Sequence, residues 1–246
     1  MALKHYKTNG VWPVAIGFIT LAATYGGAIG AVLTDQTSAM AIGWTFLSLK
    51  GTMLLTTLLG IMRRPQLGWK LFRGRYTFDH KHPRRAAVQA FTRFWWELPQ
   101  LWLGYMVSQW RNIIGQIDRV ETIGGVTFAI AEGRNDGVYK GLSLGCYVNM
   151  WISDSIEGEF DTFVRYRSSQ MLMHEFGHTL DSMRLGWGYL FIVGIPSLLS
   201  QMAESSSHGR QHQHKKLYAE RWANKHAQRY FGIQMRDLEK DRTENH

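Results

Sequence analysis

The stretch HEFGH at 174–178 combines two histidines and a glutamate in a pattern that suits metal-dependent hydrolysis. Residues four apart in a helix lie on one face about one turn apart, so the imidazoles of His174 and His178 can both reach one metal ion. Glu175 lies beside this pair and can face a metal-bound water. Zinc takes three protein ligands in catalytic sites and lowers the pKa of its bound water to about 7. Glu175 can then accept the proton and pass it to the leaving amine.

The residues around this motif predict a buried helix. Ser168 or Ser169 can cap its start. Apolar residues surround the motif on the same helix, namely Met171, Leu172, Phe176 and Leu180. Ten histidines and ten glutamates in 246 residues give about 0.016 chance occurrences of the pattern, so composition alone does not explain it. A polar trio on a buried helix needs partners, which a metal would supply. The alternative is a pair of surface histidines without a metal.

A third ligand must come from elsewhere, and a second helix predicted at 216–231 offers one. Glu220 lies 42 residues after His178 and can ligate the metal. Asn224 lies one turn further along the same face of that helix. Its side chain can orient a ligand histidine through the other ring nitrogen.

The polar loop at 205–216 and the start of the second helix hold further candidates. One of the loop histidines could replace Glu220 as a ligand or bind a substrate oxyanion: His208, His212 or His214. The simpler interpretation of these three is a solvated loop. Tyr218, two residues before Glu220, is another candidate oxyanion donor.

HEFGH followed by Glu-Arg-Trp-Ala-Asn at 220–224 resembles the gluzincin metallopeptidases. Their pattern is HExxH and then Glu-x-x-x-Asp or Glu-x-x-Ala-Asp on a second helix. The membrane-bound members, such as the HtpX protease and the CAAX prenyl protease, add transmembrane helices around a cytosol-facing site. The resemblance covers the two motifs and the layout of the membrane segments described below.

This resemblance implies a role for each matching residue. The implied zinc ligands are His174, His178 and Glu220, and Glu175 becomes the general base. Asn224 stands where the family usually has Asp, which keeps a hydrogen-bond acceptor but loses the charge. Peptidases of this kind often hold the substrate as an extra strand along a sheet edge.

A second membrane family shares the first motif. Site-2-type intramembrane proteases continue HExGH into a short stretch of helix and a glycine, as this chain does from His174 to Gly186. They take an aspartate ligand from a later Asp-Gly pair in a membrane segment. The only Asp-Gly pair here, Asp136-Gly137, lies upstream in a polar turn, and this departure favours the gluzincin resemblance.

Two apolar runs near the N-terminus predict a transmembrane helical hairpin. Residues 11–34 contain no charged residue over 24 positions, and about 20 suffice to cross a bilayer core. A polar link, 35–38, leads to a second run at 39–62. Lys50 lies near the middle of that run, where a lysine costs about 2.5–3.5 kcal/mol. Lys50 must therefore face a protein or water-filled interior, or the segment is tilted and shallow.

The charges flanking the hairpin predict its orientation. Lys4 and Lys7 precede the first run, and residues 63–93 hold nine basic residues and one acid, Asp79. The positive-inside rule then places both ends of the hairpin and the active-site domain in the cytoplasm, and we expect a bacterial inner membrane. The basic stretch has a simple role against anionic lipid headgroups. Nucleic-acid binding is the weaker interpretation, because no nucleic-acid-binding motif accompanies these charges.

The middle of the chain changes character twice. Residues 86–111 are rich in Trp and Tyr and contain Pro99, which should break a helix, so they predict a pair of membrane-hugging helices or an ordinary aromatic core. Residues 120–152 alternate in part, are rich in β-branched residues and predict a β-hairpin or small sheet. We expect the substrate to bind along an edge of that sheet. The apolar run 185–203 predicts a membrane-embedded or interfacial flap beside the active site.

The sequence therefore predicts a mainly α membrane protein with an N-terminal hairpin and an α+β zincin-like domain. The expected segments are a transmembrane hairpin at 1–62, basic and aromatic interfacial helices at 63–118, a metallopeptidase domain at 119–233 and a charged tail at 234–246. The expected function is a membrane-anchored zinc endopeptidase that hydrolyses proteins or peptides, alone or inside a larger membrane assembly. The alternatives are a non-catalytic subunit with a structural or degenerate metal site, and a membrane protein that binds lipid or nucleic acid. The single cysteine, Cys146, excludes an intramolecular disulfide framework and a Cys-cluster metal site.

Overall fold

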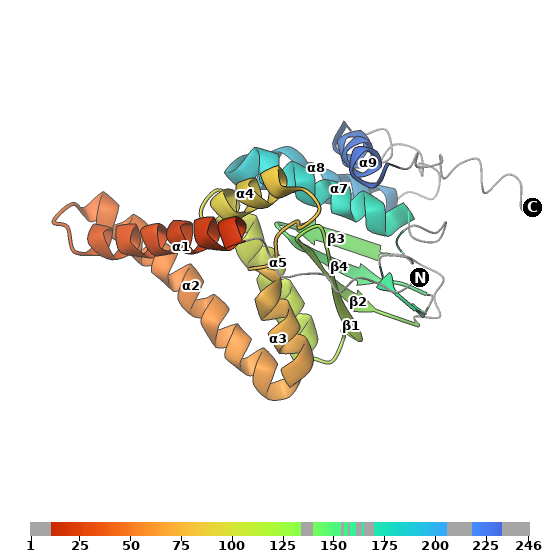
Figure 1. Ribbon diagram of the computed structural model, residues 1–246, viewed down its shortest axis with the longest axis horizontal. Helices are drawn as coiled ribbons and strands as arrows, with labels where there is room; N and C mark the ends of the chain where they lie inside the picture. The colour runs from red at the N-terminus through yellow and green to blue at the C-terminus, as the bar shows by residue number, and fades with distance from the viewer. Residues whose placement is uncertain are drawn as a thin grey trace, which may run out of the picture.

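The computed structural model describes residues 11–133, 140–153, 155–156, 158–160, 164, 170–205 and 218–232. Two long helices open this part of the chain, α1 (Val11–Val32) and α2 (Thr37–Arg63). Both are long and apolar enough to cross a membrane, as expected from the two apolar runs. They form a hairpin whose far end projects away from the rest of the molecule (Figure 1). Large apolar side chains on it face outward, including Phe18 at 72% exposure and Ile42 at 70%.

Three shorter helices connect the hairpin to the sheet: α3 (Pro65–Gly74), α4 (Pro83–Thr92) and α5 (Leu98–Ile113). Each has a proline in its first turn, where the missing N–H costs nothing. The break expected at Pro99 is therefore confirmed, and it falls between α4 and α5. One side of α5 is buried, with Leu101 and Tyr105 at 0–1% exposure, while Trp110 at the other end is 61% exposed.

Several of the basic residues in this region are buried and serve the fold. Arg93 is 2% exposed and donates to the carbonyls of Arg75, Thr77 and Gly125. Arg111, on α5, donates to the carbonyls of Ala129 and Met150 in the sheet. These arginines join the helices to the sheet through buried charge-assisted hydrogen bonds. The partners of Arg93 and Arg111 are therefore main-chain carbonyls and not lipid headgroups.

The expected small sheet is confirmed and has four strands: β1 (Arg119–Ile123), β2 (Val126–Ala131), β3 (Lys140–Leu144) and β4 (Tyr147–Trp151). Their order is β1-β2-β4-β3, so two hairpins join through a parallel β2–β4 pair and leave β1 and β3 at the edges. The β1–β2 turn is Gly124-Gly125, both with positive φ, which is the backbone that a tight two-residue hairpin turn needs.

Helices cover both faces of the sheet, so its two central strands are almost wholly buried. Alternate residues of β2 and β4 point to opposite faces. Toward the C-terminal helices, Phe128, Ile130, Val148 and Met150 enter a core with Leu172, Phe176 and Phe231. Toward α2, α3 and α5, Ala129 and Tyr147 pack with Met53, Leu71 and Tyr105.

The C-terminal part of the described chain carries the sequence motifs. Helix α7 (Gln170–Leu185) holds HEFGH and lies against the sheet, and α9 (Tyr218–Phe231) packs on it (Figure 1). Between them the chain passes through a 3₁₀ turn, Gly186–Gly188, a π-helical turn, Leu190–Gly194, and α8 (Ile195–Ser205). The direction changes by 119° between Gln170–Gly188 and Leu190–Ser200. The apolar run at 185–203 is thus a bent segment rather than one straight helix.

Candidate metal centre

Close packing of α7 on α9 builds the centre. A Cβ added to Gly177, the glycine of HEFGH, would lie 2.0 Å from the carbonyl oxygen of Ala223 on α9. Only glycine therefore allows the two backbones to approach this closely. The approach places Glu220, three residues before Ala223, over the face of α7 that carries the two histidines.

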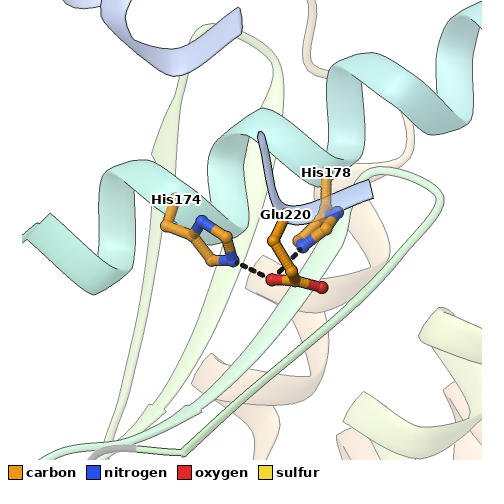
Figure 2. Close-up of side chains that lie close together, drawn as sticks. All are labelled: His174, His178 and Glu220. Carbon is orange, nitrogen blue, oxygen red and sulfur yellow. Dashed lines mark ion pairs between the residues drawn. The ribbon is translucent and has the colours of Figure 1, made fainter. Parts of the chain in front are cut away.

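The three side chains expected to ligate a metal converge (Figure 2). The Oε2 atom of Glu220 lies 2.9 Å from Nε2 of His174 and 3.5 Å from Nε2 of His178. One ligand atom from each residue falls within 4.8 Å of the others. Tetrahedral zinc with bonds of 2.0–2.1 Å separates its ligand atoms by about 3.4 Å. The donor set is therefore already close to the spacing that a zinc ion requires.

Asn224 supports His174 as expected from the sequence. Its Oδ1 atom lies 2.8 Å from Nδ1 of His174. The amide oxygen can only accept, so Nδ1 of the imidazole carries the proton and donates it. Nε2 is thereby left to face Glu220 with its lone pair when the ring is neutral. A metal ligand needs this tautomer, in which the second nitrogen is fixed by a hydrogen bond.

Asp181 gives His178 a similar neighbour, which the sequence analysis did not single out. Its Oδ2 atom lies 3.9 Å from Nδ1 of His178. Both atoms are buried without a hydrogen-bond partner among the described residues, so a small rotation of the imidazole would join them. The other oxygen, Oδ1, lies 2.6 Å from Nδ1 of His226 on α9. Asp181 follows His178 by three residues on the same helix, a spacing that could have pointed to it.

Burial and neighbouring charges shift the pKa values of the groups in this centre. Burial lowers the pKa of His174, but the hydrogen bond that its Nε2–H donates to Glu220 and the charges of Glu175 and Glu220 outweigh it and raise the value to about 9. Burial also raises the pKa of Glu220, and the two histidines reverse that effect and hold it well below its usual range. For Asp181, burial dominates and raises the pKa to about 6. Without a metal, Glu220 thus carries a negative charge that favours a cation beside it.

The bent apolar segment touches the centre directly. Ser197, on α8, donates from Oγ to Oε1 of Glu220 at 2.8 Å. Glu220 therefore keeps Oε2 for the imidazoles while Oε1 is held from the other side. The sequence analysis expected a flap at 185–203 beside the site but did not identify Ser197.

Glu175 lies next to the histidine pair and against the edge strand β3. It is 5% exposed, and Oε2 accepts a hydrogen bond of 2.5 Å from the hydroxyl of Ser143. The same hydroxyl lies 2.9 Å from the main-chain oxygen of Glu175. A Cβ added to Gly141, two residues earlier on β3, would lie 2.3 Å from Oε1 of Glu175. Ser143 and Gly141 thus hold the carboxylate in place, and no local sequence signal identifies residues that meet only through strand register.

The other site residues expected from the sequence are Tyr218 and three loop histidines. The hydroxyl of Tyr218 donates to the carbonyl of Ile192 in the π-helical turn, so it is already engaged there. His208, His212 and His214 lie outside the described residues. Tyr189, which the sequence analysis missed, is 2% exposed and donates to the carbonyl of Ser143 at 3.1 Å. The Tyr189 side chain thus covers the buried side of β3 next to Glu175.

Comparisons of the chain with protein-family models, with curated proteins and with solved structures find no match. The role of this centre therefore has to be inferred from its own chemistry: two imidazoles and a carboxylate that could hold one metal ion, beside a buried second carboxylate.

Proposed function

We propose that the chain is a membrane-anchored zinc metalloendopeptidase. One observation carries the proposal. Glu220 on α9, 42 residues after His178, brings its carboxylate oxygen into ligand spacing with the two imidazole nitrogens on α7, so that all three could bind a single ion. Two nitrogens and one oxygen are the protein ligands of many catalytic zinc sites, which keep the fourth position for water. His174, His178 and Glu220 would hold the zinc.

The chemistry at this centre follows from the position of Glu175. Bound zinc would act as a Lewis acid and lower the pKa of a water molecule to about 7. Glu175 would accept a proton at Oε1 or Oε2 and return it to the leaving amine. Ser143 donates to Oε2 and so fixes the direction in which the carboxylate points. Gly141 leaves room for Oε1, because any side chain there would occupy its position.

The edge strand β3 is the natural place for a peptide substrate. It pairs with β4 only, in an antiparallel register that joins Leu144 to Tyr147 and Leu142 to Asn149. Hydrogen-bonded and non-bonded pairs alternate in such a ladder, so the backbone groups of Gly141 and the N–H of Ser143 point to the free edge. The carbonyl of Ser143 already accepts from Tyr189. A peptide added there gains main-chain hydrogen bonds with little dependence on its sequence. It would lie next to Glu175, which supports endopeptidase activity with broad specificity.

The apolar surface near the centre supports a location at the membrane. Beyond the hairpin, the bent segment after α7 exposes several large apolar side chains: Trp187, Phe191, Ile195, Leu198 and Leu199. Exposed apolar groups in a cluster of this kind indicate contact with lipid or a partner protein. We propose that this segment rests in the interface of the same bilayer that the hairpin enters. The charge distribution favours a cytoplasmic position for both ends of the hairpin and for the centre.

Zinc content and proteolysis, measured on the same samples, test the proposal. The detergent-purified chain should bind about one zinc per molecule and cleave fluorescently labelled casein. Glu175→Gln should keep the zinc and lose at least about a hundredfold in rate, since a positioned base contributes this much. His174→Ala should lose the zinc. Glu159→Gln, which removes an equal charge at an exposed position, is the matched control and should change neither.

Two results would contradict the proposal in different ways. Equal and negligible zinc in the wild-type chain and in His174→Ala would exclude a metal centre of this kind. Stoichiometric zinc with no casein cleavage by the wild-type chain would support the alternative of a non-catalytic subunit with a structural metal site.

A further inference from the structure

A cavity of about 410 Å³ lies where the hairpin meets the rest of the molecule, on elements other than those of the metal centre. Its volume is within the range of small-molecule sites. Residues from α1, α2, the end of α3 and the turn after it, the link between α4 and α5, and the start of α5 line it. They include Tyr25, Lys50, Gly51, Leu54, Arg75 and Phe94. Two cations, Lys50 and Arg75, are thus enclosed by aromatic and aliphatic walls without an acidic residue among them.

Both cations are buried and lack an anionic partner. Lys50 and Arg75 are each 8% exposed. Neither forms an ion pair with any residue that the structure describes. Nε of Arg75 has no hydrogen-bond partner in that part of the chain. The Lys50 ammonium faces the rings of Phe46 and Phe94 at 5.1 and 5.7 Å.

Two unneutralised charges in one cavity are costly. Aromatic faces recover only about 0.5–2 kcal/mol each, whereas the penalty for burying an ion is several kcal/mol. Like charges that line one cavity also repel each other. An anion between Lys50 and Arg75 would remove both penalties at once. The cavity therefore has the charge of an anion site and the walls of an apolar one.

The position of Lys50 on the hairpin indicates where this anion comes from. On α2, residues from Thr52 onward contact the body of the molecule, for example through the bond from Trp102 to Thr52. The part from Thr37 to Lys50 is about 20 Å long at 1.5 Å per residue. Its start projects with the end of α1 (Figure 1), whereas the start of α1 packs against α4. Lys50 therefore lies where the projecting apolar end of the hairpin meets the body of the molecule.

The cavity opens to the surface at the hairpin, where exposed residues of α1 and α2 line it. Tyr25 on α1 and Leu54 on α2 line the cavity and are 36% and 57% exposed. Gly51 also lines the cavity and is exposed on α2, and a Cβ added to it meets no described atom within 4 Å. We propose that this cavity binds the phosphate headgroup of an anionic membrane lipid between Lys50 and Arg75, with the acyl chains leaving between α1 and α2. The lipid fixes the hairpin to the body of the molecule.

Lipid titration followed by native mass spectrometry tests this site on the full chain in detergent. Dioleoyl phosphatidylglycerol should bind with one saturable site, and dioleoyl phosphatidylcholine about tenfold or more weakly. Lys50→Met and Arg75→Met should each weaken phosphatidylglycerol binding about tenfold or more, because each removes a bond to a charged group. Gly51→Phe should weaken it by filling the mouth without removing a charge. Arg73→Met, in the last turn of α3, two residues before Arg75 but exposed, is the matched control and should bind normally.

The outcomes separate this site from a general surface attraction and from a free-anion site. Equal loss in Arg73→Met and Arg75→Met would overturn the proposal, as would equal binding of the two lipids. If inorganic phosphate at millimolar concentration displaces the lipid completely, the site binds a soluble anion, and the proposal of a lipid site is overturned. If Arg75→Met fails to fold, Lys50→Met and Gly51→Phe decide the question. His174→Ala should bind the lipid normally, so this test does not depend on the proposed peptidase activity.

Discussion

The hydrogen bond between Asn224 and His174 offers a quantitative test of the metal centre. The Nδ1 proton of His174 is donated to Oδ1 of Asn224 over 2.8 Å. Partners of this kind typically contribute 10–100-fold to metal affinity. The His174 side chain is 19% exposed, so water can replace part of the lost bond in Asn224→Ala. We therefore expect the zinc dissociation constant to rise nearer tenfold, or about 1.4 kcal/mol.

Competition with a chromophoric chelator at pH 7.5 would measure this change. Asn224→Asp should bind zinc at least as tightly as the wild-type chain, because a carboxylate accepts the same bond and raises the basicity of the imidazole. Lys225→Ala, the exposed neighbour on α9, is the control and should leave the affinity unchanged. Unchanged affinity in Asn224→Ala would refute the reasoning, since His174 would then bind zinc without this support or would not bind it at all.

Three further predictions follow from the same contacts. Gly177→Ala should force α7 and α9 apart, since its Cβ would lie 2.0 Å from the carbonyl oxygen of Ala223. Overpacking of about 1–3 kcal/mol corresponds to a fall in Tm of about 2–12 °C. Gly27→Ala, where the added Cβ meets no described atom within 4 Å, should not lower Tm. Gly141→Ala should keep zinc but lower kcat/KM for casein about a hundredfold, because its Cβ displaces the Glu175 carboxylate; full activity with bound zinc would argue against Glu175 as the base. Zinc affinity should rise about tenfold per pH unit between pH 6.5 and 8.5, because the pKa of His174 without metal is about 9 and zinc must displace its proton; an affinity independent of pH, measured with the same chelator, would contradict this.

The sequence indicated which side chains converge because its signals are local to two helices. HEFGH sets two imidazoles one turn apart, and Glu220 with Asn224 repeats that spacing on a second helix. The glycine within the motif turned out to be what lets these helices meet. The β-branched residues around 120–130 likewise indicated strands. The turn was expected at 133–137, whereas the structure has the first turn earlier, at Gly124-Gly125 between β1 and β2.

Other parts depended on contacts that no local pattern reveals. The charge of residues 63–93 indicated lipid headgroups, yet Arg93 is buried and donates to main-chain carbonyls, which a count of charges cannot distinguish. Ser143 reaches Glu175 only through the register of β3 against β4. The sequence left two options for Lys50, and the structure has it facing the protein interior beside Arg75, which is 25 residues away in the chain.

X-ray absorption at the zinc edge of the purified full chain tests the central claim most directly. The expected spectrum shows two imidazole nitrogens at about 2.0–2.1 Å and carboxylate or water oxygens at about 2.0–2.2 Å. His178→Ala should lose one imidazole contribution or the zinc itself. A chain that binds no zinc, or zinc whose coordination is the same in His178→Ala as in the wild type, would show that the convergence of His174, His178 and Glu220 is not a metal site.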